Sequence, residues 1–159
     1  MNKAGAQTLP VPLGISWVLA QFLMFFIYLW LPRFGPAWPC RDCFRVIGIF
    51  LVVIGAIPAI GAAINLKGSL TPFPRPVSSG NLVTSGFYRL VRHPIYFGIL
   101  LCGLGGALYA ANISRLLLTA IMAIFLDAKS AKEEKYLSVM YPEYSAYQLR
   151  VKKLLPGIY

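Results

Sequence analysis

The stretch "SGFYRLVRHPIYFG", residues 85–98, contains the chain's single histidine, His93. Arg89, Arg92 and His93 place three cationic or titratable side chains within five residues, immediately before an uncharged segment. A second polar group, Glu133-Glu134, follows about forty residues later. Guanidinium, imidazole and carboxylate groups together can hold a polar ligand through charge-assisted hydrogen bonds. We therefore expect any chemistry to occur where these two groups of side chains meet.

Each group also has a purely structural interpretation. The basic group would anchor the chain at a lipid headgroup layer, with Tyr88 and Tyr96 forming part of an aromatic belt. The two glutamates would lie on a solvated helix face, paired with Lys129 or Lys135. These interpretations do not explain why Pro94 begins the apolar segment directly after the histidine. They also leave unexplained why two adjacent glutamates stand at the end of an apolar hairpin.

The elements that would position these residues are apolar helices. Hydrophobic residues make up 58% of the 159 residues, and charged residues only 13%. Leu13–Leu31, Val46–Leu66 and Pro94–Ser114 contain no charged residue. At about 1.5 Å per residue, each could cross a hydrocarbon layer of roughly 30 Å. The sequence predicts an integral membrane protein that forms a single domain over residues 1–159, and its first segment lacks the cleavage site of a signal peptide.

A fourth apolar run, Leu116–Leu126, lies between Arg115 and Asp127. Alone it is too short to span a bilayer, but it can do so if its helix continues past Asp127 while Arg115 snorkels at the opposite face. Together with the preceding run it would form a helical hairpin that turns near Ala111-Asn112. The predicted fold class is an all-α integral membrane helical bundle with about four transmembrane helices and a cytoplasmic C-terminal helical segment.

Two segments outside the apolar runs complete this organisation. Residues 67–84 contain three prolines, which remove backbone donors and disfavour helix, so we expect an extended loop. From Asp127 onward, charged residues alternate with tyrosines and leucines. This pattern is typical of an amphipathic helix that leaves the membrane, is interrupted at Pro142 and is followed by a second short helix.

The net charge of +10 is distributed unevenly. With four spans, eleven basic residues share the side of both termini and four lie on the other side. By the positive-inside rule, both termini and the polar groups are then cytoplasmic. The basic tail suits anionic membrane lipids, and nucleic-acid binding is not expected because no soluble basic domain is present. The larger set comprises Lys3, Lys67, Arg75, Arg89, Arg92, Lys129, Lys132, Lys135, Arg150, Lys152 and Lys153, and the smaller Arg33, Arg41, Arg45 and Arg115.

Cys40 and Cys43 form a C-x-x-C motif in the first loop. A zinc site typically needs a second such pair or nearby histidines, so no metal site is expected. On the topology above, the motif faces the extracytoplasmic side, where a disulfide could form. Cys102 lies in an apolar run and is interpreted as a packing residue.

The polar motifs resemble those of the isoprenylcysteine carboxyl methyltransferase family and of the related phospholipid N-methyltransferases. The resemblance is carried by "GFYRLVRHPIYFG", by "EEKYL" beginning at residue 133, and by "YSAYQLRV" beginning at residue 144. The upstream "LTPFPRP" also looks like the corresponding loop of that family. The resemblance covers roughly residues 65–157. It divides the chain into an N-terminal helical hairpin, residues 13–66, and a cofactor-binding and catalytic half, residues 67–159.

The resemblance implies S-adenosyl-L-methionine as cofactor and a lipophilic acceptor that arrives from the bilayer. It implies that one or both glutamates hold the ribose or the amino-acid end of the cofactor. Arg150 would sit at the acceptor, where its planar fork can bind a carboxylate in two places. The implied cofactor-binding residues are Tyr88, Arg92, His93, Pro94, Tyr96, Gly98, Glu133 and Glu134, and the implied catalytic residues are Arg150, Glu133 and Tyr147.

The resemblance leaves the acceptor open. A prenylcysteine-like carboxylate is the first expectation, and a prenylated partner or membrane lipid would then bind. The alternative is the amine of a phosphatidylethanolamine-type lipid, with Arg150 and Lys152 on its phosphate. Two non-enzymatic alternatives are a small four-helix transporter and an inactive membrane scaffold. A transporter usually needs an intramembrane carboxylate, and the first three apolar runs have none.

Overall fold

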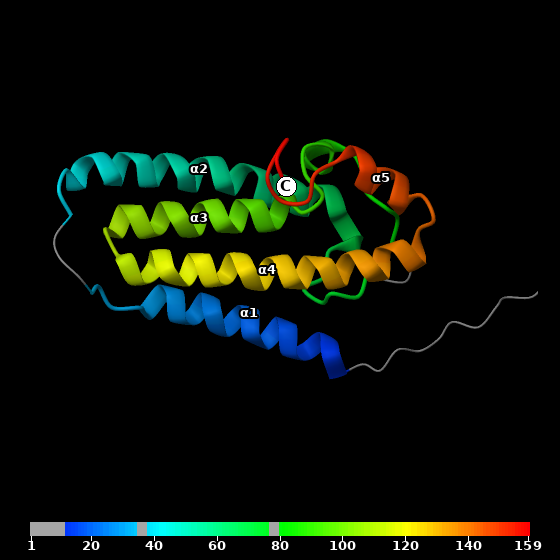
Figure 1. Ribbon diagram of the computed structural model, residues 1–159, viewed down its shortest axis with the longest axis horizontal. Helices are drawn as coiled ribbons and strands as arrows, with labels where there is room; N and C mark the ends of the chain where they lie inside the picture. Colours follow the sequence, from blue (N-terminus) through cyan, green and yellow to red (C-terminus); the bar gives the residue numbers. More distant parts are fainter. Residues whose placement is uncertain (1–11, 35–37, 77–79) are drawn as a thin grey trace, which may run out of the picture.

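The computed structural model describes residues 12–34, 38–76 and 80–159. All regular elements in these ranges are helical, in agreement with the predicted all-α class (Figure 1). The first three long helices follow the predicted apolar runs to within a few residues, and the fourth continues well past the end of its run at Leu126. They are α1 (Pro12–Trp30), α2 (Arg41–Leu66), α3 (Pro94–Ala110) and α4 (Ile113–Met140), with the short α5 (Tyr144–Arg150) and the 3₁₀ turns η1 (Lys67–Ser69) and η2 (Gly86–Arg89) completing the elements.

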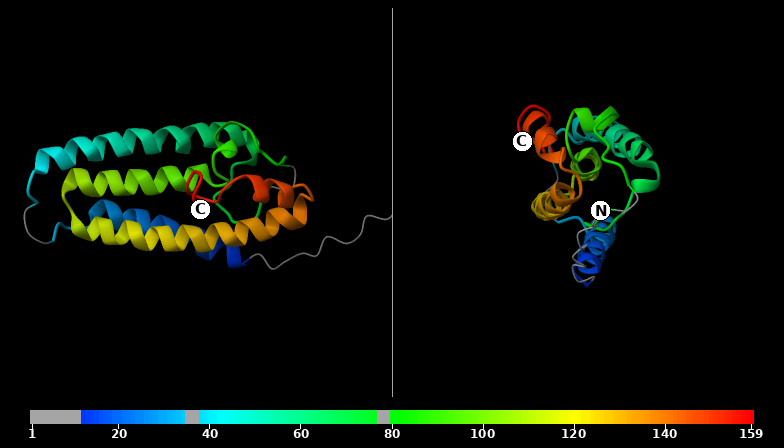
Figure 2. Two further views of the ribbon diagram at one scale, coloured as in Figure 1. Left: turned by 45° about the horizontal axis from the view of Figure 1, so that its top comes forward. Right: turned by 90° about the vertical axis from the view of Figure 1, so that its right-hand side faces the viewer.

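Helices α2, α3 and α4 lie side by side, each antiparallel to the next (Figure 1). Helix α1 packs along α4 and diverges from it toward its own N-terminus. The end view in Figure 2 shows α1 set apart from the other three helices. One long edge of the bundle is therefore more loosely covered than the others.

The turn between α3 and α4 forms where the sequence predicted it. Ala111 adopts the left-handed conformation that commonly ends helices, with φ of 47°. Asn112 then caps α4, its side-chain oxygen accepting hydrogen bonds from the backbone N–H groups of Ser114 and Arg115. Helix α4 continues without a break past Asp127. The predicted hairpin and the predicted extension of the fourth helix are both confirmed.

Asn112 also fixes the end of α1. Its amide nitrogen donates to the backbone oxygens of Leu31 and Pro32, at 3.2 and 3.3 Å. A guanidinium nitrogen of Arg115 donates to the carbonyl of Leu29 at 2.9 Å. The C-terminal end of α1 is thus held to the hairpin by polar contacts, while its N-terminal part diverges.

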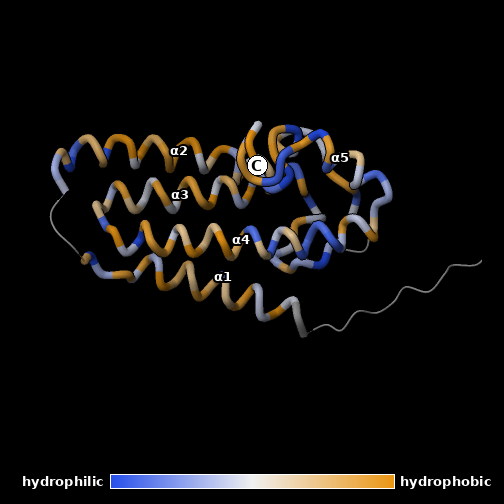
Figure 3. Tube along the Cα trace, viewed as in Figure 1, coloured by the Kyte–Doolittle hydropathy of each residue, from blue (hydrophilic) through white to orange (hydrophobic). Residues whose placement is uncertain are grey.

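The hydropathy of the chain is strongly graded along the bundle (Figure 3). Helices α1 to α3 and the first half of α4 are apolar, whereas the end of α4, α5 and the loops beside them are polar. Within the described residues, one helix, Arg41–Ser69, is both long and apolar enough to cross a membrane. Gly14–Trp30 and Pro94–Ala110 are shorter apolar helices. Membrane association is therefore indicated, while four spans and a cytoplasmic polar end remain predictions.

Glycines allow α2 and α3 to pack with their backbones in contact. A Cβ atom added at Gly48 would lie 2.6 Å from the carbonyl oxygen of Gly105, and one at Gly55 would lie 2.7 Å from that of Gly98. Small residues at helix interfaces permit this close approach in membranes. The α2–α3 pair is consequently the most closely packed part of the bundle. Helix α4 packs against α3, and the η2 turn at the polar end packs against α2.

We predict that Gly48→Val destabilises the protein, because the added side chain would collide with backbone atoms that cannot move aside. Overpacking of this kind costs about 1–3 kcal/mol. Thermal unfolding in mild detergent should show a midpoint several degrees lower. Gly68→Val is the control, because no atom lies within 4 Å of the added Cβ at Gly68. Equal midpoints for the two variants would contradict the packing argument.

Candidate functional site

The R-H-P sequence is positioned at the start of α3. Pro94 occupies the first turn of the helix, where its missing N–H is not needed, and His93 is the residue that precedes the helix. The C-terminal segment that follows α5 pairs with this stretch. The backbone N–H groups of Arg92 and His93 donate to the carbonyls of Lys152 and Lys153, at 2.8 and 3.0 Å. The backbone of the motif is therefore fixed from the opposite end of the chain.

Arg92 and Glu134 form an ion pair that links η2 and α3 to α4. Arg92 Nε lies 2.8 Å from one carboxylate oxygen of Glu134 and a terminal nitrogen lies 3.4 Å from the other. The remaining terminal nitrogen donates to the carbonyls of Gln148 and Val151 at 3.2 and 2.5 Å. Both charged side chains are 12% exposed. The guanidinium thus holds α4, α5 and the C-terminal segment together.

Glu134 accepts two further hydrogen bonds. His93 Nε2 lies 3.1 Å from its carboxylate and the side-chain amide nitrogen of Gln148 lies 3.0 Å away. Burial by itself raises the pKa of Glu134, but the hydrogen bonds and charges of His93 and Arg92 outweigh it and lower the pKa to about 2. Because Glu134 is ionised at neutral pH, His93 Nε2 carries the proton that it donates. Glu134 is therefore saturated by neighbours within the protein.

Glu133 has a different environment. Tyr96 donates its hydroxyl to Glu133 at 2.5 Å, while His93 Nδ1 and Lys129 Nζ lie further away, at 3.7 and 4.0 Å. Burial raises the pKa of Glu133, although His93, the Tyr96 hydroxyl and Lys129 all act in the opposite direction. The carboxylate is therefore less well compensated than that of Glu134. It can take an additional cation or hydrogen-bond donor.

A cavity of about 300 Å³ lies beside Glu133; we call it the polar cavity. Its volume is at the lower end of the range for small-molecule sites. The rings of His93 and Tyr96 are stacked at a centroid distance of 5.5 Å and present a flat surface there. Its polar and aromatic lining comes from Gln21, Thr71, Tyr88, Arg92, His93, Tyr96, Lys129 and Glu133.

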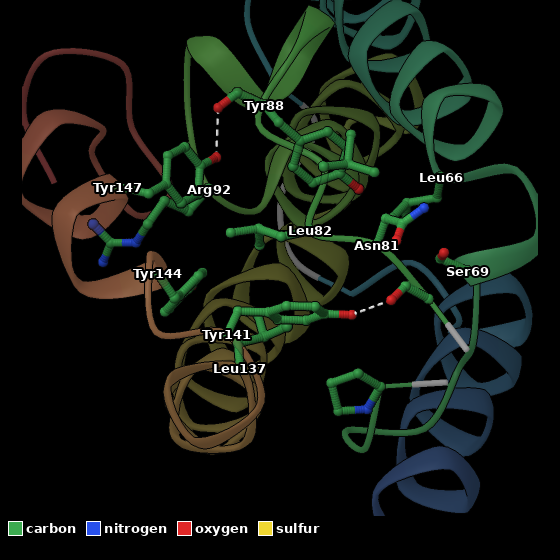
Figure 4. A pocket seen from close by; sticks show the side chains of 13 residues that line it. Leu66, Ser69, Asn81, Leu82, Tyr88, Arg92, Leu137, Tyr141, Tyr144 and Tyr147 are labelled. Atoms are coloured by element: carbon green, nitrogen blue, oxygen red, sulfur yellow. Dashed lines mark hydrogen bonds between the residues drawn. The ribbon is translucent and has the colours of Figure 1, made fainter. Parts of the chain in front are cut away.

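A smaller cavity of about 90 Å³ shares Tyr88 and Arg92 with the polar cavity (Figure 4). The Tyr147 hydroxyl, which lines it, donates to the backbone carbonyl of Tyr88 at 2.5 Å. Tyr141 donates in the same way to Gly80 at 2.6 Å. Burial raises the pKa of Tyr147 to about 12, so the phenol stays protonated at neutral pH. These tyrosines connect α5 and the end of α4 to the loops before α3.

A third cavity, of about 260 Å³, is almost entirely apolar; we call it the apolar cavity. It lies between the apolar parts of the helices, with Phe25 and Tyr28 from α1 and Met122 from α4 in its walls. Ile99 on α3 lines both this cavity and the polar cavity. The two cavities are therefore neighbours in the bundle and share Ile99 in their walls.

The sequence-predicted residues are distributed over several environments. Five of the eight proposed cofactor residues line the polar cavity: Tyr88, Arg92, His93, Tyr96 and Glu133. Glu134 lies behind Arg92 and His93, Pro94 is buried at the start of α3, and Gly98 packs against the backbone of α2. Tyr147 lines the smaller cavity.

Arg150 occupies an exposed position at the end of α5. Its Nε donates to the carbonyl of Ala146 in its own helix, at 3.3 Å. It does not contribute to the walls of the three cavities described above. The expectation that Arg150 contacts the acceptor therefore remains a prediction.

The side chains of Gln21 and Lys129, a carboxamide and an ammonium in the wall of the polar cavity, were not among the predicted site residues. Lys129 is 1% exposed, and its Nζ donates to Gln21 Oε1 at 2.6 Å and to the carbonyl of Pro72 at 2.9 Å. The sequence contains a feature that could have pointed to each of these two residues. Lys129 lies one helical turn before Glu133, and Gln21 is the single carboxamide residue in the first apolar run.

The region from α2 to α5 also matches a known family. Residues 44–144 match the model of the phospholipid methyltransferase family. This chain belongs to that family. The match includes the R-H-P sequence and both glutamates and ends at the first residue of α5. The family resemblance expected from the motifs is therefore confirmed.

Curated relatives fall into two groups by name. The chain is 30% identical over 116 residues to a probable protein-S-isoprenylcysteine O-methyltransferase of Oryza sativa subsp. indica, covering 70% of this chain and 61% of that protein. It is 34% identical over 79 residues to the protein-S-isoprenylcysteine O-methyltransferase of Schizosaccharomyces pombe, covering 48% and 34%. It is 26% identical over 149 residues to the cobalt-zinc-cadmium resistance protein CzcN of Cupriavidus metallidurans, covering 92% and 64%. The chain thus spans less than two-thirds of the length of each.

We predict opposite effects on stability for the two adjacent glutamates. Glu134→Gln should lower the free energy of unfolding by about 3 kcal/mol, because it leaves Arg92 buried without its counter-charge. Glu133→Gln should leave stability unchanged or raise it, because the raised pKa means that ionised Glu133 opposes folding at neutral pH.

Thermal unfolding of the two purified variants in the same detergent measures this difference. The depressed pKa of Glu134 further implies that the contribution of this residue is present above its unfolded pKa of about 4.3 and declines only as the pH falls toward 2. Similar losses for both variants would show that the ion pair does not hold the site together.

Proposed function

We propose that the protein is an integral membrane methyltransferase that uses S-adenosyl-L-methionine and acts on a lipophilic acceptor. The observation that supports this most directly is the position of Glu133. It is an incompletely compensated carboxylate in the polar cavity, and that cavity meets an apolar cavity at Ile99. This combination suits a cationic, hydroxyl-bearing cofactor beside an acceptor with a hydrocarbon tail.

The residues of the polar cavity fit the cofactor. The ammonium group and the ribose hydroxyls of the cofactor donate hydrogen bonds, and a carboxylate such as that of Glu133 can accept them. The aromatic faces of Tyr96 and Tyr88 suit the neighbourhood of a sulfonium cation. Glu134 is committed to Arg92 and His93, so we assign it to positioning these residues and Glu133 to direct contact.

The bound cofactor supplies an electrophilic methyl group, and the protein then has little acid–base chemistry to perform. Its main tasks are alignment of the acceptor and exclusion of water. The ion pair Arg92–Glu134 and the paired C-terminal segment keep His93 and Tyr96 in fixed positions. His93 donates its Nε2 proton to an ionised carboxylate, and we assign it the role of a positioned hydrogen-bonding group because methyl transfer requires little acid–base chemistry.

The first choice of acceptor is a prenylcysteine-like carboxylate, in line with the names of the plant and yeast relatives. The alternative, a phosphatidylethanolamine-type amine, is favoured by the description of the family. In both cases the tail would lie in the apolar cavity. We further propose four transmembrane helices, with the polar cavity and both termini on the cytoplasmic side, because eleven of fifteen cations fall on that side.

We predict that Glu133→Gln weakens binding of S-adenosyl-L-methionine by about 10-fold or more, because a charge-assisted hydrogen bond is worth about 1.5–3 kcal/mol. Calorimetry on the purified protein measures this. Glu143→Gln, an exposed residue at the start of α5, is the control and should bind like the wild type. Wild-type protein that binds no S-adenosyl-L-methionine and methylates neither prenylcysteine nor phosphatidylethanolamine would overturn the proposal.

We further propose that the polar and apolar cavities are continuous past Ile99, so that Ile99→Trp should block the passage between them. Methyl transfer to an acceptor with a fifteen-carbon prenyl tail should fall about 10-fold, whereas binding of the cofactor should change less than about twofold. Ile124→Trp is the control, because Ile124 is an exposed apolar residue on α4, outside the cavity walls. Unchanged turnover in Ile99→Trp would place the tail elsewhere.

A further inference from the structure

Lys129 is a buried cation in a wall of the polar cavity. Its side chain is 1% exposed, and its two hydrogen-bond partners within 3 Å are neutral oxygens, those of Gln21 and Pro72. Its ammonium also lies 5.5 Å from the centre of the Tyr96 ring. Burying an ammonium group without an anionic partner is costly, so such groups are usually paired. Lys129 is therefore placed to receive an anion.

The other charges near Lys129 do not fill this role. Arg92 and His93 are compensated by Glu134. Glu133 is the anion nearest to Lys129, at 4.0 Å, but it already accepts a closer hydrogen bond from Tyr96. If Glu133 engages the cofactor, as proposed above, Lys129 is left with neutral acceptors alone. A second, negatively charged ligand group would restore the balance of charge in the cavity.

The surroundings of Lys129 indicate where that group would come from. Gln21 belongs to the middle of α1, the helix that packs along α4 and diverges from it toward its own N-terminus (Figure 1). Ile99 lines both the polar and the apolar cavity, and it shares the wall of the polar cavity with Lys129. A ligand whose anionic group reaches Lys129 and whose tail fills the apolar cavity is an amphiphile.

We propose that Lys129 binds the carboxylate of the methyl acceptor and thereby selects acids over uncharged analogues. The proposal rests on the proposed methyltransferase function and adds to it the residue that recognises the acceptor's charge. Lys129 holds the acceptor's carboxylate in the polar cavity, close to Glu133 and Tyr96. Arg150, exposed on α5, contributes less to this discrimination.

A purely structural role for Lys129 would be to tie α1 and the loop at Pro72 to α4. Lys129→Gln separates the two roles, because glutamine keeps a hydrogen-bond donor but removes the charge. Lys129→Arg keeps the charge and changes the shape. Lys135→Met is the matched control, since Lys135 is an exposed lysine on the same helix.

The probes are N-acetyl-S-farnesylcysteine and its primary amide, which differ only in the charge of the carboxyl group. Binding of each is measured on purified protein, beside titration with S-adenosyl-L-methionine. The wild type and Lys135→Met should prefer the acid about 10-fold or more, as expected for one charge-assisted contact. Lys129→Gln should bind acid and amide within about twofold of each other and keep its cofactor affinity within about threefold. Lys129→Arg should retain a clear preference for the acid.

Three results would overturn the proposal: an unchanged acid preference in Lys129→Gln, a loss of cofactor affinity in that variant, or loss of the preference in Arg150→Met instead. If Lys129→Gln fails to fold, Lys129→Arg decides, because loss of acid preference in a folded, charged variant contradicts a charge-based contact. Failure of the proposed function is distinguishable, since the wild-type protein would then bind no S-adenosyl-L-methionine at all.

Discussion

The ion pair between Arg92 and Glu134 is the interaction on which the polar end of the structure depends. It joins three segments that are far apart in the sequence, because Arg92 also donates to the carbonyls of Gln148 and Val151. A buried ion pair is not in itself a strong source of stability. Here its importance is geometric, since it fixes the helix start at His93 relative to α4 and closes the C-terminal segment over it.

The saturation of Glu134 is what leaves Glu133 available. Two adjacent carboxylates in one helix point to different neighbours, and their pKa values shift in opposite directions. One carboxylate is committed to structure, and the other faces a cavity with a single close hydrogen bond. Divergent environments of neighbouring acids are a common feature of functional sites. In this protein the divergence separates a carboxylate that holds the surrounding segments together from one that lines the cavity, within a single helical turn.

Helix α1 connects the apolar part of the bundle with the polar cavity. Polar contacts of Asn112 and Arg115 hold one end of α1, and Lys129 contacts its middle through Gln21. Between these contacts the helix lines an apolar cavity that shares the wall residue Ile99 with the polar cavity. The glycine contacts of α2 and α3 provide a rigid support opposite this looser edge.

The sequence by itself determined the helices, the hairpin turn and the polar motifs, because apolar runs, a capping asparagine and prolines act through local geometry. It also indicated that the R-H-P sequence and the glutamates belong to one site. It could not divide roles between Glu133 and Glu134, which have the same chemistry and differ only in their neighbours. Nor did it identify Lys129 and Gln21 as a pair, since 108 residues separate them. Tertiary packing decided both, because burial and the position of each counter-charge are set by contacts between distant segments.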